Sequence, residues 1–200
     1  MFDARLRPLI DPPLNAAGRW LAARGISANM VTLAGLIPAI LAALAIAHEA
    51  YGMGLAAIVV NRLMDGLDGA VARANGMTDF GGYLDILADF AFYVAVPLGF
   101  GFATPDNTAA AMLLVASFTL TGISFLAYAT IAAKRGAETQ AHGAKSFFYS
   151  TGLAEGTETI VVFMAMCLWP QHFSMIAFAY AGLCLLTVAQ RTMIAARNFG

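Results

Sequence analysis

Long apolar segments constrain the fold of this chain more than any other feature. They recur at residues 30–47, 51–64, 90–103, 109–133, 159–169 and 173–190. A helix needs about 20 mainly apolar residues to cross the hydrocarbon core of a bilayer, and several segments approach or exceed that length. Only 12% of the residues are charged, whereas soluble domains usually carry about 25%. The sequence therefore predicts an all-α integral membrane protein.

Six membrane-spanning helices account for these segments. We expect them at residues 30–48, 51–74, 80–104, 108–133, 146–169 and 173–195. Together they would form one bundle over residues 30–195, within a single membrane domain of residues 1–200. Residues 11–24 are typical of a short amphipathic helix on the cytoplasmic membrane surface. Asp11 is its expected N-cap, two prolines suit its first turn, and Gly25 can end it.

The basic residues predict the orientation of the bundle. They lie before the first span, within or after the second, after the fourth and at the end of the chain: Arg5, Arg7, Arg19, Arg24, Arg62, Arg73, Lys134, Arg135, Lys145, Arg191 and Arg197. The connections near 48–51, 104–108 and 169–172 contain none. Because Lys and Arg concentrate in cytoplasmic loops, both termini and the connections 74–79 and 134–146 are expected in the cytoplasm.

Five aspartates gather within residues 65–90, although the whole chain has only 12 acidic residues. Asp65 and Asp68 are three residues apart near the cytoplasmic end of the second expected span. Asp85 and Asp89 are four residues apart in the first turns of the third. Each spacing places two carboxylates on one face of a helix. The short connection predicts antiparallel neighbouring helices, so the two acidic faces can meet in the cytoplasmic half of the membrane.

Four such carboxylates would repel one another and lose much of their hydration. Divalent cations would relieve both costs, and ligation by oxygen alone favours Mg²⁺ or Mn²⁺ over zinc. Two such ions are suited to holding a diphosphate, for which Arg73 offers a fixed positive fork. Asp79, beside the helix connection, is explained equally well as a solvated surface charge.

The stretch DGLDGAVARANGMTDFGGYLDILAD resembles the signature of the CDP-alcohol phosphotransferase family. The pattern is Asp-x2-Asp-Gly-x2-Ala-Arg-x7-Gly-x3-Asp-x3-Asp, and its fixed positions are filled by Asp65, Asp68, Gly69, Ala72, Arg73, Gly81, Asp85 and Asp89. The stretch SANMVT resembles the family's Pro-Asn-x-x-Thr element, with Ala28 in place of proline. The chain is most similar to short bacterial inner-membrane homologues of phosphatidylglycerophosphate synthase.

This resemblance implies a reaction and a set of residue roles. A CDP-linked lipid, usually CDP-diacylglycerol, would be attacked by the hydroxyl of a small polar alcohol, giving a phosphodiester lipid and CMP. Two ions, Mg²⁺ or Mn²⁺, would be held by Asp65, Asp68, Asp85 and Asp89. Asp89 would also be the general base, and Arg73 would act on the reacting phosphates. The cytidine and phosphates would be held by Asn29, Thr32, Gly69, Arg73 and Gly81. Family likeness further implies a homodimer in the bacterial inner membrane, with the active site facing the cytoplasm.

Two other classes of membrane protein use intramembrane carboxylates. A diphosphate-using prenyltransferase is expected to carry two Asp-rich motifs far apart, whereas the four aspartates here lie within 25 residues. A cation transporter or channel is expected to spread its acidic residues across the bilayer. Both of these classes fit the spacing of the four aspartates less well than a CDP-alcohol phosphotransferase does. With a net charge of −1 and no basic tract, nothing indicates a nucleic-acid partner.

The acceptor alcohol is less well defined by the sequence. Glu155 and Glu158 are three residues apart in the fifth expected span, at a depth where carboxylates are rare. They could form a polar acceptor pocket opposite the aspartates, or Arg62 could neutralise one of them across the bundle. Four basic residues could equally attract a phosphorylated acceptor such as glycerol-3-phosphate: Lys134, Arg135, Lys145 and Arg191.

The predicted orientation can be tested with reporter fusions in cells. A reporter joined after residue 200 and one inserted near residue 140 should both report the cytoplasm. A reporter inserted near residue 106 should report the opposite side, because that connection carries no basic residue. Any other pattern would overturn the orientation.

Overall fold

The structure is a computed structural model that describes residues 3–135 and 156–200, with side chains from Asp11 onward. Its helices are α1 (Asp3–Ala22), α2 (Ala28–Ala47), α3 (Tyr51–Asn75), α4 (Asp79–Ala103), α5 (Thr108–Lys134), α6 (Gly156–Leu168) and α7 (Phe173–Phe199). Two short 3₁₀ helices, η1 (Pro105–Asn107) and η2 (Pro170–His172), precede α5 and α7. The described residues contain no strand, which confirms the all-α fold class.

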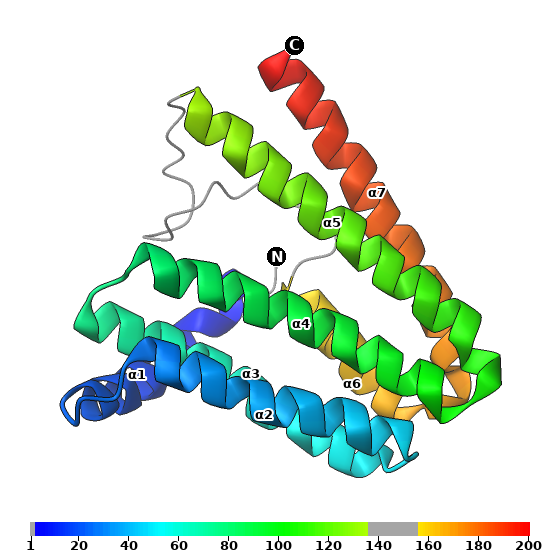
Figure 1. Ribbon diagram of the computed structural model, residues 1–200, viewed down its shortest axis with the longest axis horizontal. Helices are drawn as coiled ribbons and strands as arrows, with labels where there is room; N and C mark the ends of the chain where they lie inside the picture. Colours follow the sequence, from blue (N-terminus) through cyan, green and yellow to red (C-terminus); the bar gives the residue numbers. More distant parts are fainter. Residues whose placement is uncertain (1–2, 136–155) are drawn as a thin grey trace.

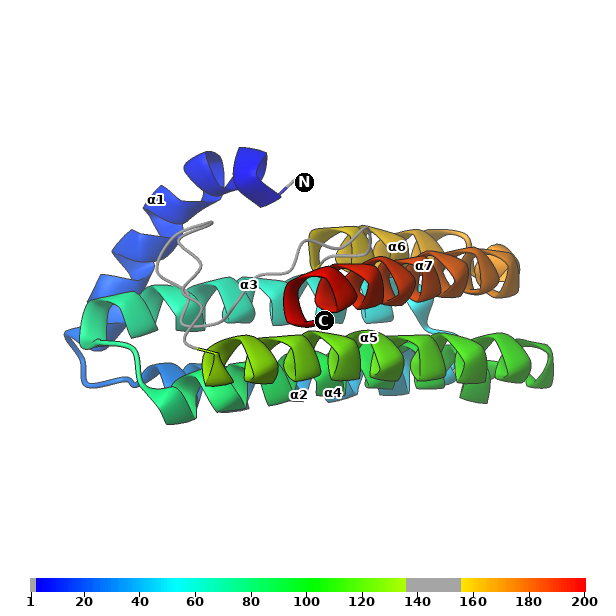
Figure 2. The same cartoon turned by 90° about the horizontal axis from the view of Figure 1, so that it is seen from above.

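The long helices form two layers (Figure 2). One layer contains α2, α4 and α5, and the other contains α3, α6 and α7. Helices α5 and α7 pack together and extend away from the rest at an angle (Figure 1). Helix α1 lies at one end of the bundle against α3. Helix α2 packs against both α3 and α4, while α3 and α4 are not closely packed against each other. The sequence predicted that α3 and α4 are antiparallel neighbours. In the structure they face each other, and α2 packs against both.

Four described helical segments are long and apolar enough to cross a membrane: Ala28–Ala47, Asp79–Ala103, Pro105–Lys134 and Pro170–Phe199. They coincide with four of the six expected spans. Helix α3 is as long as α4, but its four charged residues set it apart from this group. Helix α6 covers the second half of the expected span 146–169, and residues 146–155 lie outside the described part of the chain.

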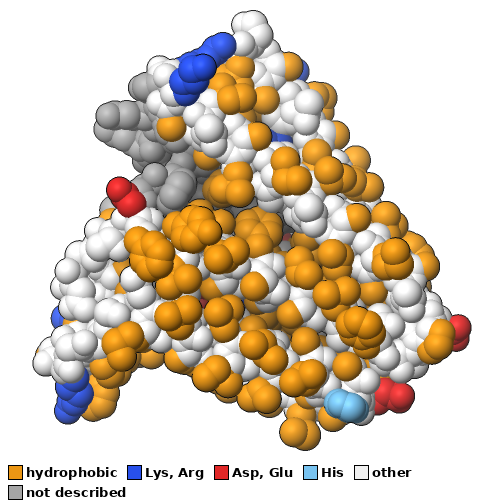
Figure 3. Space-filling model, in the orientation of Figure 1, with side chains coloured by type: hydrophobic (Ala, Val, Ile, Leu, Met, Phe, Trp, Pro, Cys, Tyr) orange, Lys and Arg blue, Asp and Glu red, His pale blue; other side chains and the backbone are white. Residues whose placement is uncertain are grey.

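The outer surface of the bundle is apolar, as lipid contact requires. Exposed large side chains on α2 include Ile37, Ile40, Leu41 and Leu44, each more than half exposed. Figure 3 shows apolar side chains spread over the face of the molecule that carries α2 and α4, with most of the visible charged side chains near its margins. A soluble monomer rarely exposes so extended an apolar surface. The surface therefore agrees with a protein that lies in a membrane.

The N-terminal helix is longer than the sequence indicated. Helix α1 begins at Asp3, so the predicted N-cap at Asp11 is wrong. Pro12 and Pro13 lie inside the helix and are exposed. Each proline removes one backbone hydrogen bond from the helix, which continues through both at the cost of those bonds. The predicted end is close to the observed one, because the helix stops at Ala22 and Gly25 follows with a φ of +79°.

Side-chain caps fix where α2 and α4 begin. Ser27 Oγ accepts a hydrogen bond from the Met30 N–H at 3.3 Å, and Thr78 Oγ1 accepts one from the Gly81 N–H at 3.1 Å. Both are N-cap residues with extended backbone, the usual geometry of a helix start. Gly76, with a φ of +96°, turns the chain between α3 and α4. These local signals place the first turns of α2 and α4 beside the last turns of α3.

The apolar core lies toward the α4–α5 connection and contains stacked aromatic rings. Phe100 of α4 and Phe173 of α7 stack with their centroids 4.4 Å apart. Phe92 of α4 contacts Phe163 of α6 edge-on at 5.6 Å. All four side chains are fully buried. The buried polar side chains of α2 and α3, Thr32, Asn61 and Asp68, lie outside this aromatic cluster.

Gly99 permits a close approach of α2 and α4, and this can be tested by substitution. A Cβ at Gly99 would lie 2.6 Å from the Ala43 carbonyl oxygen, so Gly99→Ala should force the two backbones apart. We expect a destabilisation of about 1–3 kcal/mol, the usual cost of overpacking. Gly182→Ala on α7 is the matched control, because no atom lies within 4 Å of its added Cβ. It should be neutral or slightly stabilising, since alanine favours helix. Thermal unfolding in detergent would measure both, and equal shifts would contradict this packing.

Candidate functional site

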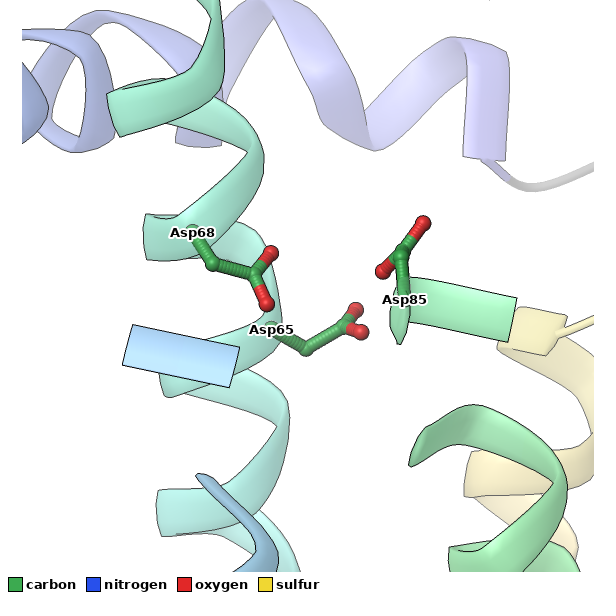
Figure 4. Close-up of side chains that lie close together, drawn as sticks. All are labelled: Asp65, Asp68 and Asp85. Carbon is green, nitrogen blue, oxygen red and sulfur yellow. The ribbon is translucent and has the colours of Figure 1, made fainter. Parts of the chain in front are cut away.

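Three aspartates converge between α3 and α4. Each of Asp65, Asp68 and Asp85 offers a carboxylate oxygen, and these oxygens all lie within 4.8 Å of one another. Figure 4 shows the two side chains of α3 and the one of α4 directed into the same space. Asp68 is buried, and the other two are partly buried. The structure therefore brings together three of the four aspartates that the spacing grouped.

A hydrogen bond from α2 orients the buried carboxylate. Thr32 Oγ1 donates to Asp68 Oδ2 at 2.6 Å, and Thr32 itself is only 7% exposed. Family likeness assigned Thr32 to the nucleotide, but here its hydroxyl lies against Asp68. Metal-binding carboxylates are commonly oriented by outer partners of this kind.

Asp89, the fourth aspartate, is paired with Arg62. Arg62 Nη1 donates to Asp89 Oδ1 at 2.9 Å and lies 3.7 Å from Asp65 Oδ2. Its guanidinium carbon lies 4.3 Å from the centroid of the Phe92 ring. The sequence left open a pairing of Arg62 with Glu155 or Glu158. Among the described residues, the carboxylate partners of Arg62 are instead Asp65 and Asp89, and Glu155 lies outside them.

Asn61 holds this arginine in place. Its Oδ1 accepts from Arg62 Nε at 2.8 Å and from Nη2 at 2.6 Å, while its Nδ2 donates to the Gly35 carbonyl at 2.9 Å. Through Asn61 and Arg62, hydrogen bonds therefore connect the backbone of α2 to Asp89 of α4. A cavity of about 10 Å³ lies among these groups, lined by Thr32, Gly35, Asn61, Arg62, Asp65, Asp68, Ala88 and Asp89. It has room for about one water molecule.

The residues expected at the nucleotide form two adjoining pairs. Arg73 Nη1 lies 3.4 Å from the position that a Cβ on Gly69 would take, so the guanidinium extends over this glycine. At the start of α4, a Cβ on Gly81 would lie 3.2 Å from Asn29 Oδ1 of α2. Gly69 follows Asp68 directly, and Gly81 is one turn before Asp85. Both pairs therefore adjoin the three aspartates, on helices that already carry them.

Two further polar residues belong to this region and were not predicted. Asn61 precedes Arg62 in an apolar stretch, where a pair of polar residues is itself a signal. Asn15 of α1 accepts hydrogen bonds from Arg73 Nε at 3.2 Å and Nη2 at 2.8 Å. No pattern in the sequence indicated that α1 would place this side chain on α3.

The site has the composition that a divalent cation requires. Its potential ligands are carboxylate oxygens, the donors that Mg²⁺ and Mn²⁺ prefer. Asp65, Asp68 and Asp85 gather in a partly buried position, and Arg62 forms ion pairs with Asp65 and with the neighbouring Asp89. Isolated charges are costly there unless they are paired or bind metal. The residues therefore fit a divalent metal centre.

The fold and this site define the class of protein. The CDP-alcohol phosphatidyltransferase family matches over residues 26–194, and the chain belongs to that family. The resemblance inferred from the signature is thus confirmed. The chain is a phosphatidyltransferase enzyme, of the membrane-bound kind that acts in phospholipid biosynthesis.

Two named proteins are similar to the chain in sequence. It is 44% identical over 192 residues to the inner membrane protein YnjF of Escherichia coli strain K12, covering 96% of this chain and 93% of that protein. It is 36% identical over 105 residues to the archaetidylinositol phosphate synthase of Pyrococcus horikoshii, covering 48% of this chain and 54% of that protein.

Solved structures share the fold. The crystal structure of Mycobacterium tuberculosis phosphatidylinositol phosphate synthase (PgsA1) with CDP-DAG bound has a TM-score of 0.70 at 20% identity, covering 90% of this chain and 92% of that one. The same synthase in complex with manganese and citrate has a TM-score of 0.66 at 22% identity, covering 90% and 87%.

The hydrogen bond to Asp68 should contribute to metal affinity. In Thr32→Val the side chain keeps its shape but cannot donate, so the carboxylate loses an orienting partner. We expect Mn²⁺ affinity to fall by about 10–100-fold, the usual cost of losing such a partner. Thr130→Val is the control, because its hydroxyl is exposed and bonds only within α5, to the Leu126 carbonyl. Calorimetric Mn²⁺ titration of the purified proteins would measure both, and equal affinities would contradict the role of Thr32.

Proposed function

We propose that this enzyme transfers the phosphatidyl group of CDP-diacylglycerol to the hydroxyl of a small polar alcohol and releases CMP. The observation that carries the proposal is the convergence of Asp65, Asp68 and Asp85 within 4.8 Å, at the spacing of the family signature. Similar proteins support the choice of substrate. The mycobacterial synthase was crystallised with CDP-DAG, and the fold of that protein is shared over most of this chain.

Two divalent ions, Mg²⁺ or Mn²⁺, would be held by Asp65, Asp68, Asp85 and Asp89. The manganese complex of the mycobacterial synthase supports divalent metal use. When bound, the ions supply positive charge that neutralises the diphosphate and the departing CMP. Thr32 would help to orient Asp68 as a ligand, and Arg62 would add positive charge beside Asp89.

The nucleotide would lie over the ends of three helices. Asn29 of α2 and Gly81 of α4 adjoin on one side, and Gly69 and Arg73 of α3 adjoin on the other. The glycines let the nucleotide approach the backbone closely. Arg73 offers N–H groups to the phosphate oxygens, so it both binds the substrate and stabilises the charge that shifts during transfer.

Asp89 would take the proton of the acceptor. The hydroxyl oxygen forms a bond to the phosphorus of the lipid phosphate, and the bond from that phosphorus to the bridging oxygen of CMP breaks. The electron pair leaves with CMP, and the hydroxyl proton passes to Asp89. Arg62, which is hydrogen-bonded to Asn61, forms an ion pair with this carboxylate. Asp89 lies one turn after Asp85 on α4, and therefore farther from the α3–α4 connection. Asp89 is therefore placed to meet an acceptor that enters beside the diphosphate.

The same reasoning gives an arrangement in the membrane. The enzyme would have six spans in the bacterial inner membrane, with α3 and α6 among them and α1 on the cytoplasmic surface. The name of its E. coli relative, an inner membrane protein, supports the location. The active site and both termini would face the cytoplasm, where CMP is released, and family likeness favours a homodimer.

An assay of the purified enzyme tests the proposal and identifies the acceptor. The protein is incubated with CDP-diacylglycerol, Mg²⁺ or Mn²⁺, and one of several alcohols: glycerol-3-phosphate, inositol, inositol phosphate or serine. CMP release and a new phosphodiester lipid of the expected mass would support it. Activity should vanish with chelator and return with either ion. Full CMP release from metal-stripped enzyme in excess EDTA would overturn the proposed metal role.

Substitution of Asp89 should separate turnover from substrate binding. Asp89→Asn keeps the shape of the side chain but cannot accept a proton at neutral pH, so turnover should fall by about 10²–10⁴-fold. Binding of CDP-diacylglycerol in the presence of Mn²⁺ should be largely retained. Asp68→Asn should lose both turnover and binding of CDP-diacylglycerol, because it removes one carboxylate from the group formed with Asp65 and Asp85. The control is Asp106→Asn, an exposed change in η1. An Asp89→Asn enzyme that turns over within a few-fold of wild type would refute the assignment of the base.

A further inference from the structure

Helix α1 packs directly on the helix that carries the family signature. A Cβ at Gly18 would lie 2.7 Å from the backbone of Ala70, and a Cβ at Gly66 would lie 2.9 Å from the Leu14 side chain. Gly66, Ala70 and Arg73 are spaced as one face of α3. Such close contacts fix the position of α1 along α3. A side chain on α1 can therefore be placed against α3 with precision.

The packing of α1 on α3 places Asn15 where it can accept hydrogen bonds from Arg73. Its Oδ1 accepts from both Nε and Nη2 of the guanidinium, at 3.2 and 2.8 Å. One edge of the guanidinium is thereby fixed on α1, and Nη1 at its other end lies over Gly69. Gly69 lies on α3 between the face that contacts α1 and the face that carries Asp65 and Asp68. The contact with Asn15 therefore presents Nη1 toward the acidic side of the helix.

Arg73 needs such a partner because it is exposed. A free arginine side chain can adopt many rotamers, and holding it in one of them has a substantial entropic cost. That cost falls on ligand binding unless the protein has already ordered the side chain. Among the described residues, Asn15 is the only side chain that accepts a hydrogen bond from Arg73.

We propose that Asn15 is a positioning residue of the substrate site: it orders the Arg73 guanidinium over Gly69 before the diphosphate of the nucleotide lipid binds. The inference rests on the proposed function, because it requires Arg73 to contact that diphosphate. It makes α1 a part of the substrate site as well as a surface helix. Asn15 itself contacts no reacting atom, so its effect should be on binding and not on the chemical step.

The test compares Asn15→Ala with a matched control. Asn75→Ala removes a similar exposed contact of α3, the bond from Asn75 Nδ2 to the Ile26 carbonyl at 3.3 Å, away from Arg73. We expect Asn15→Ala to raise the KM for CDP-diacylglycerol by about 3–10-fold, the range for ordering one side chain on binding. The kcat should stay within about twofold, because the cost of ordering Arg73 falls on substrate binding, and the bound diphosphate itself then holds the guanidinium in place. Asn75→Ala should change neither constant.

A double-mutant cycle shows whether Asn15 acts through Arg73. If it does, adding Asn15→Ala to Arg73→Ala should leave kcat/KM unchanged, since the group that Asn15 positions is already gone. Additive losses, or an Asn15→Ala enzyme identical to Asn75→Ala in KM, would overturn the inference. Failure of the proposed function is distinguishable: wild-type enzyme would then neither bind nor consume CDP-diacylglycerol. Thermal unfolding of the single variants checks that α1 remains packed in each.

Discussion

Arg62 and the aspartates of α3 and α4 link two helices whose backbones do not pack closely against each other. Helix α2 packs against both and so holds them at a separation where side chains, and not backbones, meet. Burying carboxylates between helices of an apolar bundle costs free energy unless a positive charge lies close to them. Arg62 supplies part of that charge from within the protein. Its place depends on Asn61, which is bonded in turn to the Gly35 carbonyl of α2.

The part of α3 that carries the first half of the signature meets three other helices. Its acidic face is turned to α4, where Asp85 and Asp89 lie. A second face meets α2 through the bonds of Thr32 with Asp68 and of Gly35 with Asn61. The third face meets α1, through the close approach of Gly18 to Ala70 and the bond from Arg73 to Asn15. Small residues between the fixed positions of the signature therefore serve packing, because a Cβ at Gly66 would lie 2.9 Å from the Leu14 side chain of α1.

Much of this site could be predicted from the spacing of residues along helices. The intervals within each pair of aspartates, and the short connection between the helices, were sufficient to group Asp65, Asp68 and Asp85. The pairing of Arg62 with Asp89 follows from the same rule. In antiparallel helices, a residue before Asp65 on α3 and a residue after Asp85 on α4 both lie on the far side of the three aspartates. The sequence suggested Glu155 or Glu158 of the fifth expected span as a partner of Arg62 instead, because carboxylates are rare at that depth.

The placement of Asn15 could not be predicted in that way. It depends on the angle and the offset at which α1 meets α3, and these are set by contacts between residues far apart in the sequence, such as Gly18 with Ala70. The start of α1 also differs from the predicted one. Proline usually marks the first turn of a helix, but here Pro12 and Pro13 lie inside a helix that begins at Asp3.

Charge balance connects these separate contacts under the proposed function. Four aspartates carry four negative formal charges, while Arg62 and Arg73 each carry one positive charge. Two divalent ions would leave these groups with two positive charges in excess, which would balance the two negative charges of a diphosphate diester. Without Arg62 the loaded site would have less positive charge, and without metal the aspartates would repel the substrate. Arg62 lies on the side of Asp89 and Arg73 on the side of α1, so the compensating charges are placed at opposite ends of the group of aspartates. Under this proposal the diphosphate would meet positive charge at both ends of the group of aspartates, from Arg62 held by Asn61 and from Arg73 held by Asn15.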